Sequence, residues 1–123
     1  MSASAQDIVR AYPQAGQALA EKIVEVSGRL GIPDPGWLAN LINFESAGTF
    51  SSDVRNPSSG ATGLIQFMPS TATGMGTSTA ALATLSTVAQ MDWVEQYLRQ
   101  WQSRGFGNPT DLYMAVFYPV SMG

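Results

Sequence analysis

Residues 34–46 read Asp-Pro-Gly-Trp-Leu-Ala-Asn-Leu-Ile-Asn-Phe-Glu-Ser, and this stretch decides the fold class. Asp34 is a favourable N-cap, because its side chain can accept a hydrogen bond from a free backbone N–H of the first turn. Pro35 suits the first helical position, where no backbone N–H is needed. The stretch therefore predicts a helix that runs to about Ser46 and is ended by Gly48.

One face of this helix carries both apolar side chains and a carboxylate. At about 100° per residue, Leu38, Leu41, Ile42 and Glu45 fall within roughly a third of the helix circumference. Glu45 thus belongs to the core-facing side, where loss of water raises the pKa of a carboxyl group. The C-terminal end of the helix dipole acts in the same direction. A surface capping residue is the alternative interpretation, but stability alone does not favour a glutamate there.

The rest of the chain predicts a mainly α fold in a single domain over residues 1–123, with at most a short strand segment at residues 63–67. A long helix from Ser86 or Thr87 to about Arg104 would bury a stripe of apolar side chains. We expect its aromatic residues Trp93, Tyr97 and Trp101 to be core residues. The stripe comprises Met91, Val94, Leu98 and Trp101, and the other expected helices cover residues 14–29, a short segment from Pro69, and residues 110–118.

The composition narrows the possible chemistry. The chain has neither histidine nor cysteine, which excludes Ser-His-Asp and Cys-His catalysis and makes a zinc site improbable on chemical grounds. Carboxylates must then carry any proton transfer, and we expect no cofactor. Six basic residues are scattered among nine acidic ones, which disfavours nucleic acid as a partner. We also expect no membrane span, and residues 1–7 lack the basic and apolar regions of a signal peptide.

A second informative stretch, residues 60–72, reads Gly-Ala-Thr-Gly-Leu-Ile-Gln-Phe-Met-Pro-Ser-Thr-Ala. Gly60 and Gly63 permit a close backbone approach and unusual dihedral angles. Gln66 offers both a donor and an acceptor, which an N-acetyl group would complement. The alternative is an ordinary glycine-rich turn with a solvated glutamine.

Taken together, these two stretches resemble the lytic transglycosylases of the goose-type-lysozyme-like superfamily. The family's first motif, a Glu-Ser pair at a helix end, is matched by Glu45 and Ser46. Its second motif, Gly-Leu-Met-Gln followed by Met-Pro-x-Thr-Ala, is matched by residues 63–66 and 68–72, with Ile65 in place of methionine. The resemblance covers about residues 35–119 and is strongest to phage-encoded, virion-associated members.

The third motif is imperfect. The family has Ala-Tyr-Asn on a late helix, and its tyrosine bonds to the catalytic glutamate. Residues 115–119 of this chain read Ala-Val-Phe-Tyr-Pro, without asparagine. Tyr118 is the best candidate for that role and Tyr113 the reserve. Because relatives continue beyond this helix, we expect the chain to be a domain of a longer protein.

The resemblance implies a lysozyme-like fold, with helices around a glycan-binding cleft, and cleavage of the MurNAc–GlcNAc bond of peptidoglycan. Glu45 would be the acid and base, and the products would end in 1,6-anhydro-MurNAc. Ser46, Gln66, Phe67 and the two tyrosines would bind substrate. The implied partners are glycan strands and virion or tail proteins, with activity in the periplasm or cell wall.

Two alternatives stay open. A hydrolytic muramidase needs a second carboxylate, for which Asp53 is the candidate. A non-catalytic glycan-binding or virion module on the same fold is the other.

Overall fold

The computed structural model describes residues 4–117, and it is built of helices joined by one long irregular segment. No strand occurs within these residues, where only isolated bridges join Thr62 to Arg55 and to Phe67. The mainly α class is therefore confirmed. The elements are α1 (Ala5–Ala11), the 3₁₀ turn η1 (Pro13–Ala15), α2 (Gly16–Leu30), α3 (Pro35–Glu45), α4 (Pro69–Gly74), α5 (Thr79–Ala83), α6 (Thr87–Arg99), the 3₁₀ turn η2 (Gln102–Arg104) and α7 (Pro109–Phe117).

The helix α3 begins as its sequence predicts. The backbone N–H of Gly36 donates to Asp34 Oδ1 at 2.9 Å, so Asp34 is the N-cap, and Pro35 occupies the first turn. The helix ends at Glu45, and Gly48 follows with φ of 79°. Glu45 is thus the last residue of α3, where its side chain projects from a fixed helix end.

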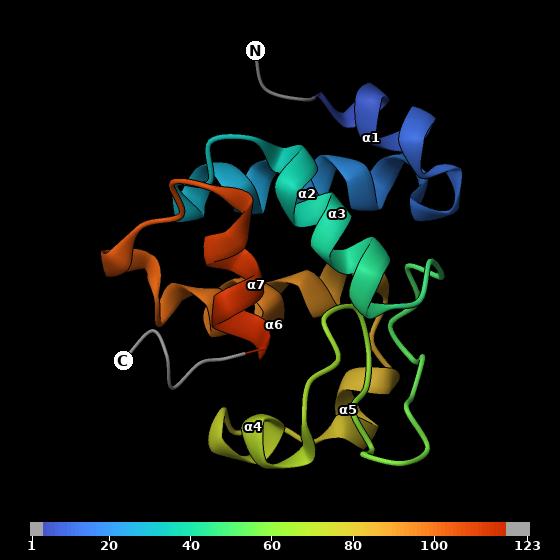
Figure 1. The fold of residues 1–123 in the computed structure, drawn as a ribbon. Helices are drawn as coiled ribbons and strands as arrows, with labels where there is room; N and C mark the ends of the chain where they lie inside the picture. Colours follow the sequence, from blue (N-terminus) through green and yellow to red (C-terminus); the bar gives the residue numbers. More distant parts are fainter. Residues whose placement is uncertain (1–3, 118–123) are drawn as a thin grey trace.

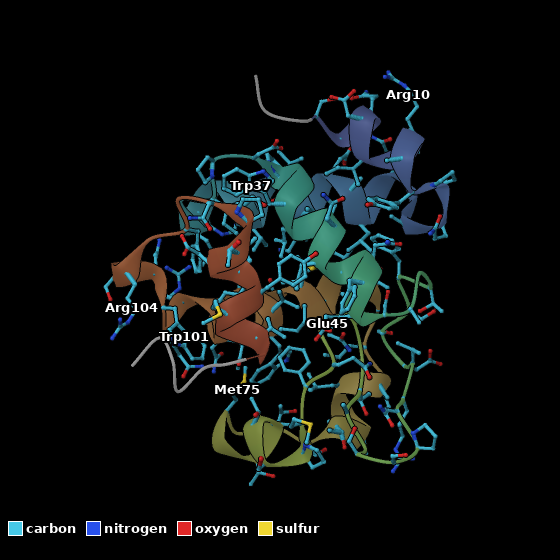
Figure 2. All side chains as sticks on the ribbon, viewed as in Figure 1. Arg10, Trp37, Glu45, Met75, Trp101 and Arg104 are labelled. Atoms are coloured by element: carbon cyan, nitrogen blue, oxygen red, sulfur yellow. The ribbon has the colours of Figure 1, made fainter. Side chains whose placement is uncertain are left out.

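A mostly aliphatic core holds the helices together. The helix α2 packs against α1, α3 and α6, and α3 packs against α7. The irregular segment adds Leu64, Ile65 and Phe67 to this core, each at most 2% exposed. The pair α4 and α5 lies at the opposite end of the molecule from α1 (Figure 1). Side chains fill the space between α3, α6 and α7 (Figure 2).

Several local expectations need correction. The helix α6 ends at Arg99 rather than near Arg104, because the chain tightens into η2. Trp101 is in consequence only partly buried, whereas the other members of the expected apolar stripe are fully buried. The segment from Gly63 to Phe67 is a turn, not a strand. The helices α1 and α5 were not predicted, since both are too short to show clear apolar periodicity.

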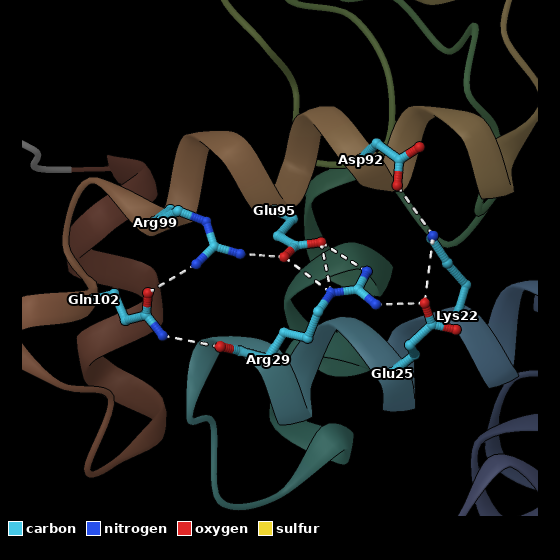
Figure 3. Close-up of polar contacts among 7 residues, drawn as sticks. All are labelled: Lys22, Glu25, Arg29, Asp92, Glu95, Arg99 and Gln102. Atoms are coloured by element: carbon cyan, nitrogen blue, oxygen red, sulfur yellow. Dashed lines mark hydrogen bonds and ion pairs between the residues drawn. The ribbon is translucent and has the colours of Figure 1, made fainter.

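A network of charged side chains joins α2 to α6 on one side of the molecule (Figure 3). Arg29 donates through Nε and Nη2 to Glu95 at 2.8–3.1 Å, and Arg99 also pairs with Glu95. Lys22 pairs with Asp92 at 3.0 Å, which adds a second link between the same helices. The Glu95 side chain is only 12% exposed. These bonds to cations lower its pKa, with Arg29 the main cause.

None of the helices in residues 4–117 combines the length and the apolar character needed to cross a membrane.

Candidate active site around Glu45

Glu45 lines an open hollow of about 390 Å³. The wall is assembled from α3, from α7 and from the irregular segment between α3 and α4. The other lining residues are Asn56, Ala61, Gln66, Met68 and Val116. A carboxylate at the end of α3 therefore meets the residue 56–68 segment, as the two sequence stretches together suggested.

Burial sets the acidity of Glu45. The side chain is half-buried, and desolvation raises its pKa to about 7. Among residues 4–116 it has no cationic partner that would oppose this shift. A carboxyl group with a pKa near 7 can both donate and accept a proton at neutral pH.

The turn opposite Glu45 is held by a buried glutamine that sequence reasoning did not select. Leu64 N–H donates to Gln90 Oε1 at 2.8 Å, and Gln90 Nε2 donates to the carbonyls of Ser52 and Leu82 at 2.9 Å. Gly63 lies against this amide with φ of 89°, and a β-carbon there would lie 2.4 Å from Gln90 Oε1. Only glycine fits that position. The buried Gln90 amide thus holds the turn through its backbone, and this turn forms part of the wall of the hollow.

Gln66 carries less free hydrogen-bonding capacity than we expected. Its Nε2 donates to the carbonyls of Val54 and Gly63 at 3.1 and 3.0 Å. These bonds hold the residue at a φ of 57°, a conformation that side chains other than glycine rarely adopt. Its amide oxygen is the group left to accept a further hydrogen bond.

The other predicted residues lie as follows. Ser46 is fully buried, and its hydroxyl donates to the Ile42 carbonyl and accepts from Phe50 N–H, so the expectation that it contacts substrate is wrong. Phe67 is buried and lines a neighbouring hollow. Tyr113 packs edge-on against Phe44, with ring centroids 6.0 Å apart, and does not line the Glu45 hollow. Tyr118 lies outside the described residues.

Tyr97 is a neighbour of Glu45 that the sequence did not identify. It is buried, as predicted for a core residue, and its hydroxyl donates to the Ala115 carbonyl at 2.8 Å. Burial raises its pKa to about 12, and the negative charge of Glu45 adds to the shift. The helical spacing of Tyr97 signals only burial. No sequence pattern indicates which carboxylate lies near its ring.

Asp53, the expected second carboxylate of a hydrolase, is exposed and lines a different hollow with Arg55, Thr62 and Thr79. It does not join Glu45. Within the described residues no three acidic side chains gather as a metal site would require. Comparisons with protein-family models, curated proteins and solved structures found no match.

Proposed function

We propose that this chain is a peptidoglycan lytic transglycosylase of lysozyme-like fold that cleaves the β-1,4 bond between MurNAc and GlcNAc. The observation that carries the proposal is Glu45, a half-buried carboxyl group of raised pKa in the wall of an open hollow. Among the described residues of that wall it is the sole ionisable group. One carboxyl group is what a transglycosylase requires, because a sugar hydroxyl replaces the attacking water.

In the first step, the protonated Glu45 gives its proton to the glycosidic oxygen, and the bond from C1 of MurNAc to that oxygen breaks. The GlcNAc side leaves with a 4-hydroxyl group. The carbonyl oxygen of the MurNAc acetamido group stabilises the positive charge that develops at C1. Glu45 is now an anion and can act as a base.

In the second step, Glu45 removes the proton from the MurNAc 6-hydroxyl as its oxygen attacks C1. The 1,6-anhydro ring closes, and Glu45 recovers its proton, so no water is consumed. Both steps favour a pKa close to the working pH, and the burial of Glu45 supports such a value.

Other residues of the wall have supporting roles. The Gln66 amide oxygen would accept a hydrogen bond from the acetamido N–H, while its Nε2 stays on the backbone. Met68 is 45% exposed and supplies an apolar surface beside Glu45. Ser46 acts at a distance from substrate, because its hydroxyl ties the end of α3 to Phe50 and so positions Glu45. Tyr118 stays our candidate for a hydrogen bond to Glu45.

The family resemblance extends the proposal to a phage virion component that acts on the periplasmic cell wall, with virion or tail proteins as partners. The hydrolytic muramidase receives less support, because Asp53 lines a separate hollow. The non-catalytic module also receives less support, because it does not explain why the Glu45 carboxyl group is half-buried without a cationic partner among the described residues.

Product analysis tests the reaction type. Purified peptidoglycan is digested, and the muropeptides are weighed by mass spectrometry before and after borohydride reduction. Transglycosylase products weigh one water less than hydrolytic products and take up no hydrogen. Mostly reducible ends would identify a muramidase. No released muropeptides from the wild type, under conditions in which a control lysozyme works, would leave the non-catalytic module.

A further inference from the structure

The hollow around Glu45 is the first of three neighbouring hollows that share lining residues in turn. A second hollow, of about 210 Å³, shares Gln66, Met68 and Val116 with it. A third, of about 480 Å³, shares Thr71 and Tyr97 with the second. We use "groove" for these three neighbouring hollows, which share lining residues in turn from Glu45, by way of Tyr97, to Trp101.

The far end of the groove lies between two helices. The helix α4 supplies Thr71, Gly74 and Met75, and α6 with the residues just beyond it supplies the other wall. Gln96 and Gln100 stand one helical turn apart on that wall, beside Tyr97 and Trp101 at the same spacing. The two aromatic rings lie 5.0 Å apart between centroids. Figure 2 labels Met75 and Trp101 on the same side of the molecule.

Hydrogen bonds fix the backbone of Trp101. Its N–H donates to the Leu98 carbonyl and its own carbonyl accepts from Arg104 N–H, both at 3.0 Å. Gln102, the next residue, donates through Nε2 to the Arg29 carbonyl at 2.9 Å, which ties this turn to α2. A partly exposed indole ring on a fixed backbone loses little conformational entropy when a ligand binds to it.

The chemistry of this end is aromatic, amide-bearing and uncharged. Its described lining contains no Lys, Arg, Asp or Glu. Pockets of this kind recognise a ligand by apolar contact and a few well-placed hydrogen bonds. Glutamine amides both donate and accept, as sugar hydroxyl and acetamido groups do. A peptidoglycan stem peptide, in contrast, carries carboxylates that call for cations.

We propose that the α4–α6 end of the groove is a distal saccharide subsite, in which Trp101 stacks on an N-acetylhexosamine of the strand that is cleaved at Glu45. Gln96 and Gln100 bind the hydroxyl and acetamido groups of that sugar. The inference rests on the proposed function, since it assigns the glycan strand to both ends of one groove. It predicts that affinity depends on chain length and that Trp101 is the source of this dependence.

Binding is measured by calorimetry in the Glu45→Gln background, in which we expect cleavage to be about 10²–10⁴-fold slower, with chito-oligosaccharides from the disaccharide to the hexasaccharide. Affinity should increase with length. Adding Trp101→Ala should weaken the hexasaccharide about tenfold or more, as loss of one aromatic stacking contact does, and leave the shortest ligand unchanged. Trp101→Phe should retain most of the affinity. Trp93→Phe, on α6 but outside the groove lining, is the matched control.

Equal affinities of the parent and Trp101→Ala at every length would overturn the subsite, as would failure of the Glu45→Gln protein to bind any of these sugars. If Trp101→Ala weakens binding to a free stem peptide but not to the sugars, the α4–α6 end of the groove binds the peptide instead. Where Trp101→Ala fails to fold, judged by circular dichroism, Trp101→Leu and Gln100→Ala provide the same comparison.

Digestion of peptidoglycan by the wild type keeps the two proposals separate. If the wild type cleaves peptidoglycan, and Trp101→Ala leaves the dependence of affinity on chain length unchanged, the subsite is contradicted and the transglycosylase proposal stands. Suppose instead that the wild type releases no muropeptides, while binding depends on chain length and Trp101→Ala removes that dependence. This result would support the subsite and contradict the transglycosylase.

Discussion

Two part-buried glutamates, Glu45 and Glu95, differ in what surrounds them. Glu95 accepts hydrogen bonds from Arg29 and Arg99, which lower its pKa (Figure 3). Glu45 has no cationic partner among the described residues, and burial raises its pKa to about 7. A buried carboxylate with cations beside it stabilises the fold as an anion. One that is buried without them is poised to exchange a proton.

The helix α6 separates these two environments. Glu95 and Tyr97 are two residues apart, so they project from nearly opposite sides of the helix. The Glu95 side faces α2 and its charged network, whereas Tyr97 lines the groove and lies within the electrostatic influence of Glu45. One helix thus carries a stability network on one side and part of a candidate site on the other.

The largest expected effect is the loss of activity when the carboxyl group of Glu45 is removed. Glu45→Gln preserves shape and removes the proton, so release of muropeptides should fall by about 10²–10⁴. The control is Glu95→Gln, which should retain near-normal activity per folded molecule. A Glu45→Gln protein that digests peptidoglycan at the wild-type rate would contradict the proposed role.

The second effect is the pH dependence of kcat/KM. Glu45 must be protonated for the first step, and its pKa in the free protein is raised to about 7. We therefore expect kcat/KM to fall about tenfold per pH unit above that value. Rates on a soluble glycan fragment between pH 5 and 9 test this. A fall that begins near pH 4.5, the ordinary glutamate value, would show that Glu45 is not desolvated in solution.

The third effect concerns stability at Glu95. Because its folded-state pKa is lowered, Glu95 stabilises the protein above its usual value of 4.5, and this contribution is lost as the pH falls through the lower folded-state value. Glu95→Gln should cost about 1–2 kcal/mol at pH 7, or roughly 3–8 °C in melting temperature. Thermal denaturation should show the gap narrowing below pH 4. An unchanged melting temperature at pH 7 would mean that the network contributes nothing.

The smallest effect has the opposite sign. The raised pKa of Glu45 means that its contribution is most favourable below pH 4.5 and is lost as the pH rises to about 7. At pH 8 the unfolding free energy of Glu45→Gln should therefore exceed that of the wild type by about 1 kcal/mol after allowance for partial exposure, and its melting temperature should be higher. The two should converge near pH 4. A lower melting temperature at pH 8 would show that the carboxylate is satisfied there.

Parts of the candidate site were predictable because they depend on local geometry. Asp34, Pro35 and the apolar spacing of α3 placed Glu45 at a core-facing helix end before any contact was known. The glycines of the following segment predicted unusual dihedral angles, and Gly63 has a positive φ. The expected short strand at residues 63–67 is instead a turn. Ser46 was misjudged, because nothing in a Glu-Ser pair distinguishes a hydroxyl that meets substrate from one that accepts Phe50 N–H.

The sequence by itself determined the mainly α class, the position of Glu45 on its helix and the lack of histidine or cysteine chemistry, since these follow from residue type and from spacing within one helical turn. Tertiary structure alone decided which side chains meet. It brought Gln90 under the turn, Tyr97 near Glu45, and Arg29 of α2 to Glu95. The acidity of a carboxyl group depends on its solvent and its charged neighbours. Arg29, the main cause of the lowered pKa of Glu95, lies 66 residues away in the chain, and Glu45 loses water only when the helices pack, so the two opposite shifts depend on tertiary structure.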